Sequence, residues 1–104
     1  MIDEKILEKT ILTAINTGKV LLGAKEVSNS IKGNKIIIFS TSLSNTILSN
    51  LKEICNLNSI PIIPFNGDSI KLGKICRKPF KVSILGIRVP GDADISLIVS
   101  SKNE

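Results

Sequence analysis

The stretch KIIIF, Lys35–Phe39, decides the fold, because it is a continuous apolar run without polar alternation. Such a run is typical of a strand buried on both faces, and leaving it half solvated would be costly. We therefore expect a central strand at Ile36–Phe39. Directly after it, TSLSN (41–45) offers hydroxyl and amide side chains that can cap a following helix.

The chain on either side alternates between helical and strand periodicity. Helices are predicted within 3–18, 24–32, 45–57 and 66–76, and further strands over 19–23, 60–65, 81–89 and 95–101. Pro61 and Pro64 favour an edge or end position for the 60–65 strand. Together these segments predict an α/β fold, a three-layer α-β-α sandwich whose central mixed sheet of four to five strands has helices on both faces.

Two of the predicted helices carry clear apolar faces. The first helix has Ile6, Leu7, Ile11, Ala14 and Ile15 on one stripe, and Gly18 is a natural left-handed stop for it. The 45–57 helix has a broad apolar face formed by Ile47, Leu48, Leu51, Ile54, Cys55 and Leu57. We assign both faces to the core.

Length and composition bound the possible functions. The 104 residues suffice for a single domain, 1–104, and 42% hydrophobic with 22% charged residues is ordinary for a globular protein. No apolar run approaches a membrane span, and MIDEKILEKT is too charged for a signal peptide. We therefore expect a cytoplasmic protein, monomeric when free and without a membrane partner, whose net charge of +5 favours an anionic partner.

The sequence offers little for catalysis or metal binding. It has no histidine, and Cys55 and Cys76 fit no metal spacing, so they are interpreted as small buried hydrophobes in a reducing cytoplasm. Asp92 and Asp94 lie in VPGDADI, where a turn or cap role is the default. The segment GDSIKLGKI departs from a phosphate-binding loop in its glycine spacing and lacks the hydroxyl that binds magnesium. We expect a binding protein with no cofactor, not an enzyme.

Two local features point to a binding surface. In TGKVLLGAKEVSNSIK (17–32) a strand passes at Gly23 and Ala24 directly into a charged helix, a junction suited either to packing or to close approach of an outside molecule. Phe80 stands in CRKPFKVSILG among Arg77, Lys78 and Lys81. Such a phenylalanine is either a core residue or a base-stacking surface, and the local sequence alone slightly favours the core.

These segments, in order, resemble the archaeal and eukaryotic large-subunit ribosomal protein L-thirty-e family, which belongs to the kink-turn RNA-binding superfamily. The matching stretches are TGKVLLGAKEVSNSIK, NKIIIFSTS, IPIIPF, SIKLGKICRKPFKVSILGI and PGDADI, spread over nearly the whole chain. Each is weak alone, and together they favour this family over a generic α/β domain. The resemblance implies a ribosomal protein that binds ribosomal RNA within the large subunit.

The resemblance also implies which residues contact RNA. Gly23 and Ala24 would admit the RNA backbone, Lys25 would contact a phosphate or guanine edge, and Glu26 is similar to a glutamate used on guanine amino groups, which many members of this family lack. Ser42 stands where relatives commonly carry asparagine, so its contact is open or has passed to Asn45. The second loop would contribute Phe80, Lys81, Val82, Ser83 and Ile84, with Phe80, Val82 and Ile84 bracketing a base.

A second function class stays open at this stage. A stand-alone kink-turn binder of guide ribonucleoproteins, or a regulatory RNA binder, would share most of these residues. Guide-RNA members usually have asparagine at the position of Lys25, so Lys25 with Phe80 favours the ribosomal family. An unrelated catalytic domain is the remote third possibility.

Overall fold

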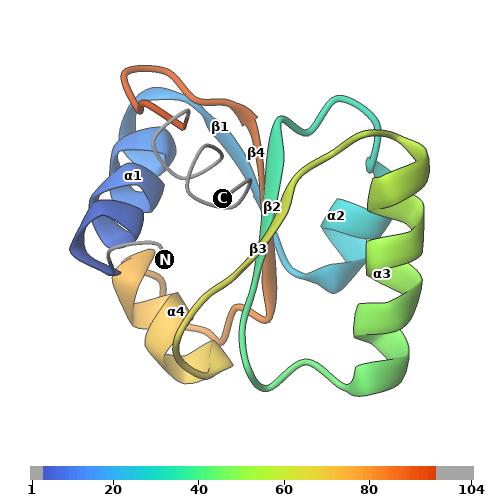
Figure 1. The fold of residues 1–104 in the computed structure, drawn as a ribbon. Helices are drawn as coiled ribbons and strands as arrows, with labels where there is room; N and C mark the ends of the chain where they lie inside the picture. Colours follow the sequence, from blue (N-terminus) through green and yellow to red (C-terminus); the bar gives the residue numbers. More distant parts are fainter. Residues whose placement is uncertain (1–3, 96–104) are drawn as a thin grey trace.

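The computed structural model describes residues 4–95, which form alternating helices and strands (Figure 1). In chain order these are α1 (Glu4–Thr17), β1 (Lys19–Leu22), α2 (Ala24–Asn29), β2 (Ile36–Phe39), α3 (Asn45–Leu57), β3 (Ile62–Pro64), α4 (Ser69–Ile75) and β4 (Ile84–Val89). Each element lies within or close to a segment predicted from periodicity. The predicted strand over 95–101 lies outside the described residues, except for Ile95.

The strands form a mixed sheet in the order β1-β4-β2-β3. β4 is antiparallel to both β1 and β2, whereas β2 and β3 are parallel. The run Ile36–Phe39 therefore pairs on both sides, which confirms the predicted central strand. β3 lies at an edge, where Pro64 removes no hydrogen bond that a second neighbour would need.

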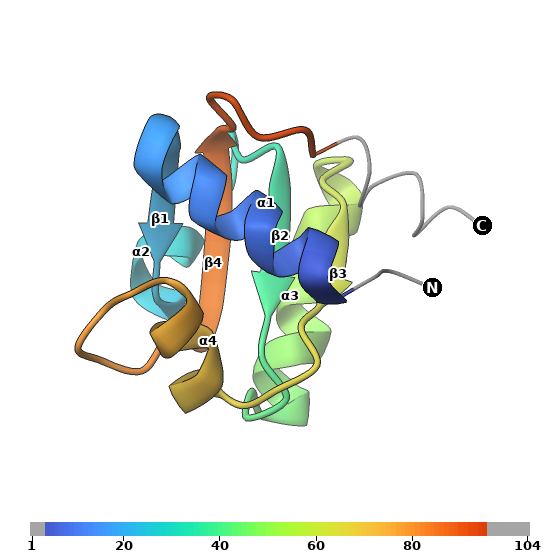
Figure 2. The same cartoon turned by 90° about the vertical axis from the view of Figure 1, so that its left-hand side faces the viewer.

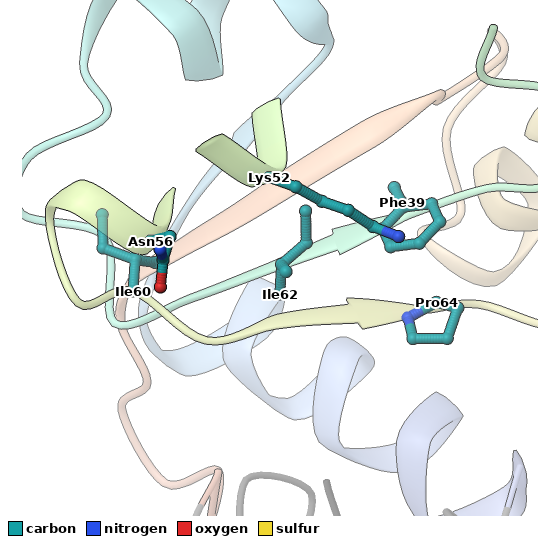
Figure 3. A pocket seen from close by; sticks show the side chains of 6 residues that line it. All are labelled: Phe39, Lys52, Asn56, Ile60, Ile62 and Pro64. Carbon is teal, nitrogen blue, oxygen red and sulfur yellow. The ribbon is translucent and has the colours of Figure 1, made fainter. Parts of the chain in front are cut away.

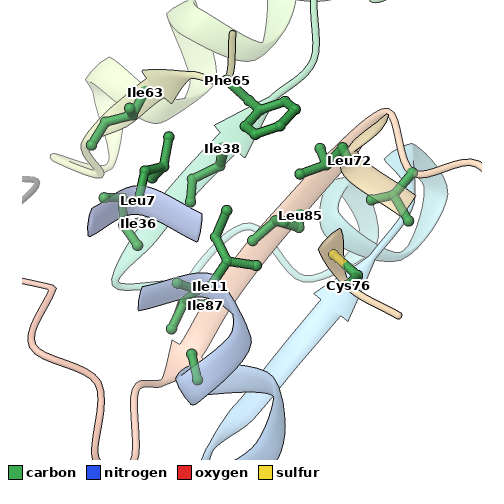
Figure 4. Close-up of a cluster of buried hydrophobic side chains, with 12 residues drawn as sticks. Leu7, Ile11, Ile36, Ile38, Ile63, Phe65, Leu72, Cys76, Leu85 and Ile87 are labelled. Atoms are coloured by element: carbon green, nitrogen blue, oxygen red, sulfur yellow. The ribbon is translucent and has the colours of Figure 1, made fainter. Parts of the chain in front are cut away.

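Helices cover both faces of the sheet, which confirms the predicted sandwich. α1 and α4 lie on one side and α2 and α3 on the other (Figure 1). Ile36 and Ile38 pack toward α1 and α4, in a cluster that includes Leu7 and Leu72 (Figure 4). Ile37, between them in sequence, joins the cluster under α2 and α3. This alternation explains why KIIIF needs apolar residues at every position.

The apolar faces of the helices are narrower than predicted. In α3 only Leu51 and Cys55 are buried, whereas Ile47, Ile54 and Leu57 are 46%, 41% and 78% exposed. In α1 the predicted burial is confirmed for Leu7, Ile11 and Ala14, and Ile15 is partly buried. Ile6, from the same predicted stripe, is 41% exposed. A helix lying on a flat sheet buries a single stripe, so residues on the flanks of a broad apolar face stay in solvent.

Gly18 follows the last residue of α1, but it is not the predicted left-handed stop. The glycines with positive φ among the described residues are Gly23, Gly33 and Gly91. Gly18 is instead required by close packing, because a Cβ there would lie 1.9 Å from the carbonyl oxygen of Val89. The prediction named the right boundary for the wrong physical reason.

Candidate nucleic-acid interface

The predicted site residues gather at one end of the sheet. β1, β2 and β3 end there, β4 begins there, and α2, α3 and α4 start from the loops that follow the first three strands. Figure 2 shows the loop between α4 and β4, in orange, projecting from this end beside the point where β1 ends. Three segments that are distant in sequence therefore share one surface.

Backbone hydrogen bonds hold these segments together. The Gly23 N–H donates to the Ile84 carbonyl at 2.8 Å, and the Ser40 N–H donates to the Ser83 carbonyl at 2.8 Å. The start of α2 and the end of β2 are thus both tied to the beginning of β4. The two loops that the resemblance identifies are adjacent in space because of this tie.

Gly23 has the geometry of a residue that leaves room for a ligand. Its φ of 100° and ψ of 152° are tolerated essentially by glycine alone. Nothing lies within 4 Å of the position a Cβ would take, so packing does not explain the glycine. No side chain caps the first turn of α2. Beyond this open point Lys25 and Glu26 are exposed, and Ala24 is half-buried.

Ser42 lies on the loop between β2 and α3, Asn45 is the first residue of α3, and both are exposed. The Ser42 Oγ accepts a hydrogen bond from the Ser69 N–H at 2.7 Å, which ties this loop to the start of α4. Because a hydroxyl also carries a proton, Ser42 can still donate one bond to a ligand. Ser44 caps α3 by accepting from the Ile47 N–H at 3.3 Å, as the TSLSN pattern predicted.

The loop around Phe80 differs from the prediction. Phe80 is 54% exposed, so the interpretation as a core residue is wrong. Val82 and Ile84, however, are 0% and 1% exposed, and they pack into opposite core clusters, so their side chains do not bracket a base. The reason is that the chain enters β4 here, and the Val82 N–H is held by the Ser69 carbonyl at 3.0 Å. Lys81 is exposed and Ser83 is half-buried.

Phe80 is one wall of a hollow that the sequence did not predict. The hollow has a volume of about 400 Å³ and is lined by Ile70, Lys74, Lys78, Pro79, Phe80 and Lys81. Ile70 is 48% exposed, out of phase with the buried positions Ser69, Leu72 and Gly73 of α4. The position of Ile70 in the helical repeat of α4 was therefore the one feature of the sequence that could have predicted an outward-facing apolar side chain here. The result is an apolar surface with cations around it, suited to a base and its phosphates.

A second hollow lies between α3 and the β3 edge of the sheet (Figure 3). Its volume is about 410 Å³, and it is lined by Phe39, Lys52, Asn56, Ile60, Ile62 and Pro64. The Lys52 ammonium lies 6.0 Å from the centroid of the Phe39 ring. The lining contains no carboxylate, thiol or hydroxyl, and Lys52 is its one ionisable side chain.

The cysteines are buried hydrophobes, as predicted. Cys55 and Cys76 are both buried, and neither forms a disulfide. Burial raises the pKa of the Cys76 thiol to about 11 despite the opposing charge of Lys78, which makes this thiol unreactive at neutral pH. Within residues 4–95 no group of three His, Cys, Asp or Glu side chains could hold a metal ion. None of the helices in this range combines the length and apolarity needed to cross a bilayer.

The sequence is similar to known ribosomal proteins over most of its length. Residues 5–97 match the family described as ribosomal protein L7Ae/L30e/S12e/Gadd45. The large ribosomal subunit protein eL30 of Methanosphaera stadtmanae is 37% identical over 91 residues, which cover 86% of this chain and 93% of the relative. The proteins of the same name from Methanothermobacter thermautotrophicus and Methanocaldococcus jannaschii are 32% and 31% identical, covering 86% and 92% of this chain and 93% and 89% of the relatives. The chain therefore belongs to the ribosomal protein L7Ae/L30e/S12e/Gadd45 family.

Proposed function

We propose that this chain is a structural protein of the large ribosomal subunit and binds a kink-turn-like site in ribosomal RNA with the end of its sheet. Its relatives from several archaea carry the name large ribosomal subunit protein eL30. It works by binding and not as an enzyme, within the cytoplasmic ribosome. It enters the subunit as a monomer and needs no cofactor.

The first half of the proposed site is the junction of β1 and α2. Because Gly23 has no side chain and open space beside it, an RNA backbone can come into contact with the main chain there. Ala24 is small enough to keep this approach open. Lys25 is exposed and supplies the phosphate or guanine contact, while Glu26 can accept from a guanine amino group.

The second half is the surface formed by the β2–α3 and α4–β4 loops. Phe80 supplies the stacking face, and Lys81 holds a flanking phosphate. Ser83, Ser42 and Asn45 offer polar contacts to splayed bases. Val82 and Ile84 belong to the site through their backbone, because their side chains are buried in the core.

The observation that carries the proposal is the bond from the Gly23 N–H to the Ile84 carbonyl. It places an open, glycine-only backbone beside the loop that exposes Phe80. A single bent RNA can thus contact both with its backbone and with an extruded base. An apolar core has no need for either feature, whereas RNA recognition at kinks needs both.

The first test compares two exposed lysines at opposite ends of the sheet. Lys25→Ala should weaken binding of a kink-turn RNA and reduce the slope of log affinity against log salt by about 0.7–0.9, as expected when one phosphate contact is lost. Lys35→Ala is the matched control, because Lys35 immediately precedes β2 and lies at the far end of the sheet. Equal losses from both variants would indicate a diffuse basic surface and contradict a defined site.

The second test concerns the assembly. Tagged chain should co-sediment with large ribosomal subunits at high salt, and crosslinks should map to one bent site in the large-subunit RNA. Recovery in small guide or messenger ribonucleoproteins, without large subunits, would favour the stand-alone kink-turn binder instead.

A further inference from the structure

A cationic groove lies on the α1–α4 side of the molecule and adjoins the hollow beside Phe80. It is lined by Lys5, Glu8, Lys9, Leu12, Lys74, Ile75 and Arg77, with a volume of about 420 Å³. The inward faces of the same helices fill the core, as Leu7, Ile11, Leu72 and Cys76 do in Figure 4. The outward sides of α1 and of the end of α4 therefore meet solvent where the two helices come together.

The charge of this groove is strongly one-sided. Four of its lining residues are cationic, and Glu8 is the one carboxylate among them, which leaves a net charge of 4 − 1 = +3. No Asp or Glu occurs between Asp68 and Asp92, and this interval supplies Lys74, Arg77 and Lys78 at the end of α4 and directly after it. Such clustered like charges repel one another in the free protein, and a polyanion relieves that repulsion.

Arg77 occupies a backbone position that glycine usually takes. Its φ is 58°, and the Lys78 N–H donates to the Gly73 carbonyl while the Arg77 N–H donates to the Lys74 carbonyl, each at 3.0 Å. This pair of bonds is the Schellman pattern that ends α4, with Arg77 in the left-handed position. An arginine there costs stability relative to glycine.

The groove is continuous with the Phe80 surface. Lys74 lines both the groove and the hollow beside Phe80, and Arg77 and Lys78 follow it at the end of α4. The whole molecule measures 29 × 29 × 25 Å. Because an RNA duplex carries a phosphate at every nucleotide of both strands, an arm that ran from Phe80 along α4 would present several phosphates to the groove.

We propose that the α1–α4 groove is a second RNA contact, in which Arg77 and Lys9 hold phosphates of a duplex arm adjoining the site at Phe80. This inference rests on the proposed function. The lining has no aromatic side chain for base stacking, and its polar atoms are mostly cationic donors, so the groove reads the sugar-phosphate backbone and not the base sequence. Leu12 and Ile75 form its apolar floor.

The test uses Arg77→Gly. This change removes the guanidinium, and glycine adopts the positive φ at this position without strain. We expect the melting temperature to stay equal or rise, and the affinity for a kink-turn RNA with a long duplex arm to fall about tenfold. In the double variant with Arg77→Gly and Lys9→Ala, two phosphate contacts are lost, so the slope of log affinity against log salt should fall by about 1.8. Both variants should bind a probe with that arm truncated as the unchanged protein does. Lys19→Ala with Lys35→Ala, at the far end of the sheet, is the matched double control.

The outcomes separate the two proposals. If the unchanged protein binds both probes equally well and Arg77→Gly changes neither, the groove proposal is overturned while the proposed function stands. If the unchanged protein binds neither probe, both are overturned. Polyglutamate and plain duplex RNA of equal charge should also be compared as competitors of the long-arm probe. If polyglutamate competes as strongly as the duplex RNA, the groove binds an acidic protein and the RNA assignment is contradicted.

Discussion

Phe80→Ala separates a binding role from a structural one, because the structure assigns this side chain a different environment from the neighbouring Val82. Phe80 is 54% exposed, so slightly less than half of its surface is buried. Complete burial of a phenylalanine contributes about 1.5–3 kcal/mol, so truncation should cost about 1 kcal/mol of folding stability. A base stacked on an aromatic ring contributes about 1–3 kcal/mol, so the same truncation should weaken RNA binding by roughly 5- to 150-fold.

The matched control is Val82→Ala, two residues along the same loop. Val82 is fully buried, so its truncation should lower stability by about 1–3 kcal/mol and leave the affinity of the folded protein unchanged. Urea unfolding and RNA titration should be measured on the same preparation of each variant. A Phe80→Ala protein that loses stability but keeps full affinity would refute the stacking role, and so would a Val82→Ala protein that behaves in the same way as Phe80→Ala in both assays.

Three further predictions concern the fold and the site. Gly23→Ala should lower the free energy of unfolding, measured with urea, by about 1–3 kcal/mol. The cause is the backbone φ of 100° and not a clash, because no atom lies within 4 Å of the new Cβ. An unchanged urea midpoint would contradict this prediction. The amides of Ile36–Phe39 should exchange with solvent among the slowest in the chain, and fast exchange there would exclude a central strand. Because burial raises the pKa of Cys76 from 9.0 to about 11, the folded state keeps a proton that the unfolded state loses, so stability should fall as the pH rises through this interval. Cys76→Ala should show a smaller fall in urea unfolding, and an identical pH slope would count against the burial of this thiol.

The sandwich could be predicted because its strongest signals are local. An uninterrupted apolar run at Ile36–Phe39 allows few alternatives to a strand covered on both faces, and the sheet places it between two neighbours. Prolines in the 60–65 segment similarly indicated an edge, because a missing N–H is tolerated there. The start of α3 could be predicted from the TSLSN segment, in which the Ser44 side chain accepts from a backbone N–H in the first turn.

Burial within an element was harder to predict, since it depends on neighbours that the sequence does not identify. Ile47 and Ile54 have the same local periodicity as Leu51, yet only Leu51 reaches the sheet. Gly18 illustrates the same limit, because the carbonyl that excludes a side chain there belongs to Val89, far along the chain. Long-range packing therefore decides which of several equivalent apolar positions forms the core.

The candidate site contains residues that the sequence could suggest and residues that it could not. Gly23 could be singled out because the sequence shows a strand passing into a helix at a glycine, and the family resemblance then added Lys25 as a candidate RNA contact. In the second loop the same kind of reasoning grouped Phe80 with Val82 and Ile84, although the chain turns between them and sends the latter two into opposite core clusters. Ile70 and Lys74, which come from α4, line the surface that Val82 and Ile84 were expected to form. An RNA-binding surface assembled from several loops depends on the hydrogen bonds that join them, such as the one between Gly23 and Ile84, and no periodicity in the sequence encodes that pairing.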